Sequence, residues 1–143
     1  MVKVVKKSIQ LLVVDDQSIV RKGICALLEQ VKDIDVIGEA ADGIEAVAQA
    51  DKLHPDVILM DLVMPNMDGV TAIQQILAHQ PKARIMALTS FVAEDKVLPA
   101  IKAGAMGYLL KDSEPEELIA AIRKVNRGEP SLTPAVARMV MEE

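Results

Sequence analysis

The sequence has almost no aromatic residues and only one cysteine. Among its 143 residues there is no Trp, and Phe91 and Tyr108 are the only aromatic side chains. Proteins that bind single-stranded nucleic acids usually stack the bases on aromatic rings, so the composition argues against this mode of binding. Cys25 has no second cysteine with which to form an internal disulfide, which fits a reducing cytoplasm.

Positive charge and long apolar runs are also scarce. Lys and Arg number 16 against 21 Asp and Glu, which gives a net charge of −5 and argues against a basic surface for nucleic-acid phosphates. Uninterrupted apolar runs such as residues 57–60 fall far short of the roughly 18 residues that a membrane span needs. Lys3, Lys6 and Lys7 precede one apolar run, but no small-residue cleavage site of a signal peptide follows it. We therefore expect a cytoplasmic protein that makes no membrane contact.

Five short apolar runs alternate with segments of helical periodicity. The runs cover residues 9–14, 36–37, 57–60, 84–88 and 105–110. After the first run, apolar residues from Val20 to Val31 recur at the spacing of one helix face. Nearly continuous apolar strands are typical of a parallel sheet that helices cover on both faces. Five units are too few for an eight-fold barrel, so we predict an α/β fold with a doubly wound, five-stranded parallel sheet, flavodoxin-like (βα)5, in the order 2-1-3-4-5.

The composition changes near the C-terminal end. Residues 8–127 hold all five strand–helix units and form one predicted domain. Residues 129–134 read Glu-Pro-Ser-Leu-Thr-Pro, which is typical of a linker. Thr133 before Pro134 predicts the N-cap and first position of a helix. We expect residues 128–143 to be a linker and the start of a helix that leads to a further domain.

Polar residues stand at the ends of four predicted strands. Asp15 and Asp16 follow the first strand, Asp61 the third, Thr89 the fourth and Lys111 the fifth. Open α/β sheets bind ligands beyond the carboxyl ends of their strands, so these side chains are expected to converge there. Carboxylates that lie close together repel one another unless they bind a proton or a cation, and a set of oxygen ligands favours Mg²⁺. A metal ion beside a carboxylate and a lysine is an arrangement suited to phosphoryl transfer to the carboxylate.

These motifs as a set resemble those of response-regulator receiver domains. The matching segments are Asp15-Asp16 and residues 61–69, 87–90 and 104–111. The resemblance implies that Asp61 accepts a phosphoryl group from a sensor histidine kinase. The implied Mg²⁺ ligands are Asp15, Asp16, Asp61 and the backbone carbonyl of Val63. It also implies that Lys111 pairs with the phosphoryl group, that Thr89 hydrogen-bonds to it, and that Tyr108 turns inward as Thr89 moves. Such a protein is a switch rather than an enzyme, because it catalyses only its own phosphotransfer and dephosphorylation.

The finer resemblance is to the NarL/FixJ (LuxR-type) subgroup of transcriptional regulators. Residues 104–112 and 128–134 carry it. It implies a helix-turn-helix output domain, absent from this sequence, through which alone DNA would be bound, and a possible homodimer on phosphorylation. Two alternatives stay open. One is a stand-alone receiver that acts through protein–protein contacts. The other is a Mg²⁺-dependent aspartyl phosphohydrolase of the haloacid-dehalogenase type, whose usual Asp-x-Asp motif stands here as Asp15-Asp16-Gln17.

Overall fold

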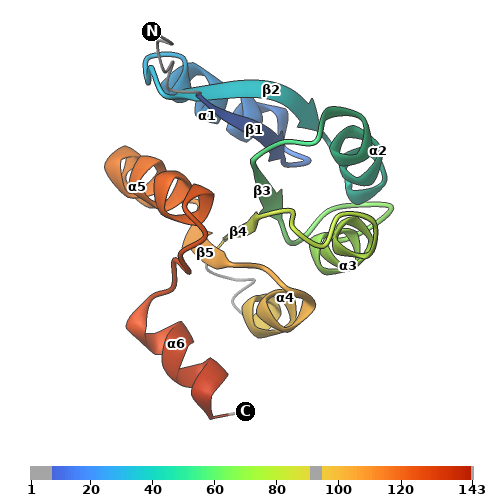
Figure 1. Cartoon of the computed structure of the whole chain (residues 1–143), viewed down its shortest axis with the longest axis vertical. Coiled ribbons are helices and arrows are strands. Elements are labelled where there is room, and N and C mark those ends of the chain that lie inside the picture. The colour runs from blue at the N-terminus through green and yellow to red at the C-terminus, as the bar shows by residue number, and fades with distance from the viewer. Residues whose placement is uncertain (1–7, 91–94, 143) are drawn as a thin grey trace, which may run out of the picture.

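The computed structural model describes residues 8–90 and 95–142, along which strands and helices alternate (Figure 1). The elements are β1 (Ile9–Val14), α1 (Ser18–Leu28), β2 (Ile34–Ala40), α2 (Gly43–Leu53), β3 (Val57–Asp61), α3 (Gly69–His79), β4 (Ile85–Thr89), α4 (Val97–Ala103), β5 (Gly107–Leu110), α5 (Pro115–Asn126) and α6 (Pro134–Met141). The predicted five rounds of strand and helix are thus confirmed. None of the helices in the described part is long and apolar enough to cross a membrane.

The five strands form one parallel sheet in the order β2-β1-β3-β4-β5, as the sequence predicts. β1 and β3 are neighbours, although a whole strand–helix unit separates them in the sequence. In register, Val14 lies beside Met60, and Asp61 lies beside Leu88 on β4. The carboxyl ends of β1, β3 and β4 therefore reach the same edge of the sheet, where the candidate site lies.

Helices cover both faces of the sheet, and each face has its own apolar core. Leu12 and Val14 point to the face that α2, α3 and α4 cover, whereas Leu11 and Val13 point to the face that α1 and α5 cover. All four side chains are fully buried. Successive residues of a strand point to opposite faces, so a strand covered on both sides must be apolar at every position.

Short polar residues begin the helices next to the site. The Asp42 carboxylate accepts a hydrogen bond from the Glu45 amide at the start of α2, and Asp68 does the same for Thr71 at the start of α3. Such caps satisfy amides that lack a partner within the helix. Thr133 caps α6 ahead of Pro134, as predicted.

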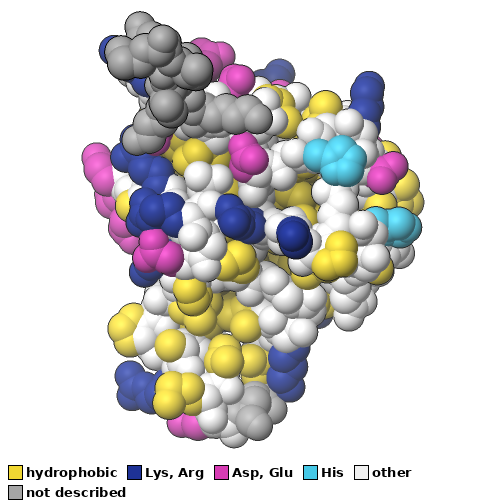
Figure 2. Space-filling view, viewed as in Figure 1, with side chains coloured by type: hydrophobic (Ala, Val, Ile, Leu, Met, Phe, Trp, Pro, Cys, Tyr) yellow, Lys and Arg dark blue, Asp and Glu magenta, His cyan; other side chains and the backbone are white. Residues whose placement is uncertain are grey.

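The segment between α5 and α6 lies against the edge strand β5. The Tyr108 amide donates to the Ser131 carbonyl oxygen (2.9 Å), and the Ser131 amide donates to the Met106 carbonyl oxygen (3.0 Å). A Cβ atom at Gly107 would lie only 2.9 Å from that Ser131 oxygen, so glycine permits this close approach. Val136 of α6 is buried in the same apolar core as α4. Hydrophobic side chains gather in the lower part of Figure 2, where α6 lies.

Candidate functional site

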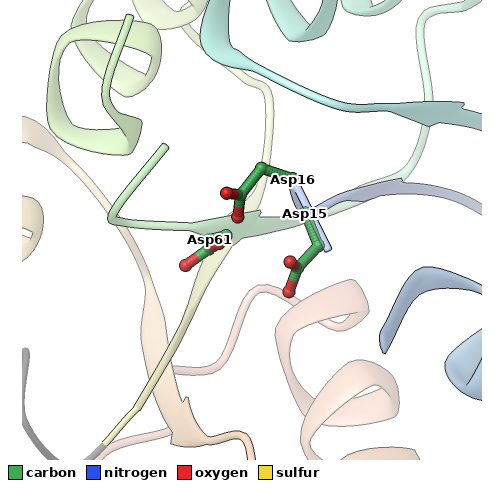
Figure 3. Close-up of side chains that lie close together, drawn as sticks. All are labelled: Asp15, Asp16 and Asp61. Carbon is green, nitrogen blue, oxygen red and sulfur yellow. The ribbon is translucent and has the colours of Figure 1, made fainter. Parts of the chain in front are cut away.

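Three aspartates meet at the carboxyl edge of the sheet (Figure 3). Asp15 and Asp16 follow β1, and Asp61 is the last residue of the neighbouring β3. One carboxylate oxygen from each lies within 4.8 Å of the others. Asp15 and Asp61 are buried, whereas Asp16 is exposed. The cluster thus has a buried floor and one carboxylate at its solvent side, as a site open to a small ligand requires.

Lys111, just after β5, completes the cluster. Its Nζ lies 2.9 Å from Oδ2 of Asp15 and 3.2 Å from Oδ2 of Asp61. One ammonium group thus serves two buried carboxylates, and apart from this ion pair the Asp15 Oδ2 atom has no partner among the described residues. The site has more negative than positive charge and a buried oxygen short of donors. Its all-oxygen donor set fits a hard divalent cation such as Mg²⁺.

The charges of the cluster shift its proton equilibria. Burial, followed by the negative charge of Asp15, raises the pKa of Asp61 to about 7, and Lys111 and the Val63 amide only partly oppose this. For Lys111, burial acts to lower the pKa, but the hydrogen bond to Asp15 and the charges of Asp61 and Asp15 prevail and raise it. A cation among the carboxylates would favour the ionised, nucleophilic form of Asp61.

The loop after β3 brings Val63 next to the cluster. The Val63 amide donates to Oδ1 of Asp61 (3.3 Å). The β3–α3 loop (residues 62–68) returns on itself, because the Gly69 amide donates to the Leu62 carbonyl oxygen (3.2 Å). The backbone of Val63 therefore lies beside the Asp61 carboxylate, and the Val63 carbonyl stays a predicted metal ligand.

Thr89 and Tyr108 occupy the neighbouring strands β4 and β5. Thr89 is fully buried, and within residues 8–90 and 95–142 its hydroxyl makes only a long hydrogen bond (3.4 Å) to the Ser90 carbonyl oxygen. Tyr108 is buried as well, beside Ala87 in register. Thr89 stands two residues after Ala87, so Thr89 and Tyr108 point to the same face of the sheet.

Sequence reasoning missed the groups that hold Asp15. The Gln17 amide donates to its Oδ1 (2.8 Å), and the Arg21 guanidinium donates to its backbone carbonyl oxygen (2.6 Å). Arg21 is itself paired with Glu39, near the end of β2 (3.2 Å). An arginine near the start of a helix looks like any solvent-facing residue, so nothing in the local sequence marks this role.

Comparison with known proteins agrees with the geometry. Residues 11–123 match the family model of the response regulator receiver domain. The chain is 51% identical over 133 residues to the transcriptional regulatory protein LiaR of Bacillus subtilis, covering 93% of this chain and 63% of LiaR. It is 44% identical over 129 residues to the response regulator protein VraR of Staphylococcus aureus, covering 90% of this chain and 62% of VraR. The chain thus spans less than two thirds of the length of these relatives.

Solved structures show the same likeness. A two-component response regulator of the LuxR family from Aurantimonas superimposes with a TM-score of 0.85 and 34% identity, over 95% of this chain and 97% of that one. The signal receiver domain of the putative response regulator NarL from Mycobacterium tuberculosis gives 0.82 and 30%, over 87% and 100%. The chain belongs to the receiver-domain family of two-component response regulators, and its type is that of the LuxR/NarL regulators.

Proposed function

We propose that the chain is a phosphorylation switch that accepts a phosphoryl group on Asp61 from a sensor histidine kinase. The observation that carries the proposal is the placement of Asp61 between Lys111 and two further carboxylates at the switch point of the sheet. In the transfer, a carboxylate oxygen of Asp61 forms a bond to phosphorus as the phosphorus–nitrogen bond of phosphohistidine breaks. The imidazole of the kinase leaves with the electron pair of that bond.

The residues around Asp61 would neutralise negative charge in two ways, by holding a metal ion and by supplying an ammonium group. Asp15, Asp16, Asp61 and the Val63 carbonyl would hold Mg²⁺, which would neutralise the negative charge on the phosphoryl oxygens during the transfer. Lys111 already touches both buried carboxylates, so its ammonium can turn to a phosphoryl oxygen as Asp61 loses its negative charge. A chain with this equipment promotes its own phosphotransfer and dephosphorylation and is not an enzyme that turns over a separate substrate.

The proposed readout starts at Thr89. Its hydroxyl has a weak partner in the Ser90 carbonyl and would gain a stronger one in a phosphoryl oxygen. Movement of Thr89 toward the site frees space on the face that it shares with Tyr108. The two arrangements form a pre-existing equilibrium, and the phosphoryl group shifts it by its differential binding.

The wider role follows from the LuxR/NarL type. We infer that residues 8–127 are the receiver and that residues 128–143 connect it to a helix-turn-helix output domain, through which the protein binds DNA in the cytoplasm. Support comes from the relatives named as transcriptional regulators, which are longer than this chain. Phosphorylation would favour a homodimer that presents two such domains.

Labelling with acetyl phosphate and Mg²⁺ tests the acceptor. Intact-mass spectrometry should show one added phosphate, and Asp61→Asn should abolish it. Asp68→Asn is the matched control, because Asn also caps a helix and Asp68 lies outside the cluster. Full labelling of Asp61→Asn would overturn the assignment.

The readout has its own test. Thr89→Ala should accept phosphate at Asp61, yet the amide shifts around Tyr108 and in α4 should change much less than in the wild type. Thr89→Ser keeps the hydroxyl and should respond like the wild type. Equal shifts in Thr89→Ala and the wild type would exclude the coupling through Thr89.

A further inference from the structure

The β3–α3 loop is attached to a helix that contributes no group to the reaction. The Asn66 side-chain amide donates to Oδ2 of Asp42 (2.7 Å), the residue that caps α2. The Gly43 amide donates to the Met67 carbonyl oxygen (3.0 Å). Asp42 and Asn66 are 24 positions apart in the sequence, so this contact is a tertiary one.

The backbone at both ends of this contact is built for close approach. Asn66 has a φ of 67°, and the Met67 amide donates to the Pro65 carbonyl oxygen (2.7 Å), which makes a tight three-residue turn. A Cβ atom at Gly43 would lie 2.5 Å from the Met67 carbonyl oxygen, so only glycine lets the loop sit this near. Hydrogen bonds from the Glu45 amide and from Asn66 also lower the pKa of Asp42, which keeps its carboxylate charged and accepting.

The loop has two attachments, and Val63 lies between them. One is the closure at its base, where the Gly69 amide bonds to Leu62, and the other is the contact of its tip with the start of α2, through the Asn66–Asp42 and Gly43–Met67 hydrogen bonds. Val63 presents its amide to Asp61 from this span. A short segment held at both ends has little freedom, so the attachment at the tip also limits where the Val63 carbonyl can point.

We propose that Asp42 and Asn66 are positioning residues, whose hydrogen bond holds the β3–α3 loop so that the Val63 backbone faces the carboxylate cluster. The inference rests on the proposed function, because it takes the Val63 carbonyl as a metal ligand. Groups that orient metal ligands without touching the metal commonly change metal affinity by about tenfold or more when removed.

Two variants break the bond and keep the local backbone. Asn66→Gly removes the amide but accepts the positive φ without strain. Asp42→Ser is too short to reach Asn66 but still caps α2. The control is Gln80→Ala, which removes another side-chain bond between α2 and the end of α3, from Gln80 Nε2 to the Ala50 carbonyl oxygen (2.9 Å), far along the helices from the site.

Isothermal titration with Mg²⁺ provides a readout that needs no phosphorylation. We expect each variant to bind Mg²⁺ about tenfold more weakly. The double variant should bind no more weakly than either single one, because all three break the same bond. Gln80→Ala should lower Tm by a similar amount and bind Mg²⁺ like the wild type.

The outcomes separate this inference from the proposed function. Wild-type affinity in Asn66→Gly, or equal weakening in Gln80→Ala, would overturn the positioning role while Asp16→Ala still abolishes binding. Mg²⁺ binding that does not depend on Asp16 would instead overturn the metal site of the proposed function.

Discussion

Two ion pairs in this molecule have similar geometry and opposite surroundings. Arg123 of α5 contacts Asp33 with two hydrogen bonds of 2.8 and 2.9 Å, and both side chains are about two fifths exposed, at 44% and 39%. Lys111 contacts Asp15 and Asp61 at 2.9 and 3.2 Å, but these carboxylates are 0% and 3% exposed. The better-formed pair is therefore the one that water screens.

The difference in burial decides how strongly the charges of each pair interact. An exposed pair exchanges contacts with water for contacts with each other and gains little, whereas buried charges interact strongly and cost free energy to bury. The Arg123–Asp33 pair joins α5 to the chain before β2 and has a structural role. In the Lys111 cluster, burial and the charge of Asp15 raise the pKa of Asp61. A bound cation or a phosphoryl group would relieve the repulsion between these carboxylates.

Removal of Lys111 should cause the largest loss of stability. Lys111→Met leaves two buried carboxylates without their cation, and we expect a loss of about 3 kcal/mol of unfolding free energy at pH 8. Urea unfolding measures it, with Lys124→Met on the exposed side of α5 as the control. A loss no larger than that of the control would mean that water already screens the cluster.

The pH dependence of Asp61 should give the next largest effect. The pKa of Asp61 is about 7 in the folded state and near 4 in the unfolded state. At a pH between these two pKa values, the folded state keeps a proton on Asp61 that the unfolded state has lost. The metal-free protein should therefore lose stability as the pH rises from about 4 to 7. Asp61→Asn has no such proton, so its Tm should exceed that of the wild type at pH 8 and approach it at pH 5. A constant difference across this range, measured in EDTA, would contradict the raised pKa.

Addition of Mg²⁺ should partly relieve the buried charge. At ten times its dissociation constant, a ligand that binds only the folded state adds about 1.4 kcal/mol, which raises Tm by about 4 °C for a chain of this size. Differential scanning fluorimetry at pH 8 measures the shift. Asp16→Ala should show none, and an unchanged shift in that variant would place the cation elsewhere.

Removal of the exposed Arg123–Asp33 pair should have the smallest effect on stability. Arg123→Gln is expected to change Tm by no more than about 2 °C, and the change should fade as salt is added. Thermal unfolding at low and high ionic strength provides the measurement. A large loss that persists at high salt would show that exposure is a poor guide to the worth of this pair.

The sequence predicted the architecture because its periodicity is local. Continuous apolar strands such as β1, and helix starts such as Thr133-Pro134, follow from the geometry of the chain within a few residues. Errors were small, as at Val31, which lies beyond the end of α1. The polar residues at the strand ends were also readable, because the sheet topology sends parallel strands to a common edge.

The sequence by itself thus determined which residues form the sheet, which faces are apolar and which aspartates converge. Only the tertiary structure decided which atoms meet, because contacts such as Asn66 to Asp42 depend on loops whose shape no short stretch of sequence sets. The same holds for the docking of Ser131 on β5 and for the arginine that holds Asp15. The raised pKa of Asp61 likewise arises from burial and from Asp15, 46 positions earlier, which the fold brings beside it.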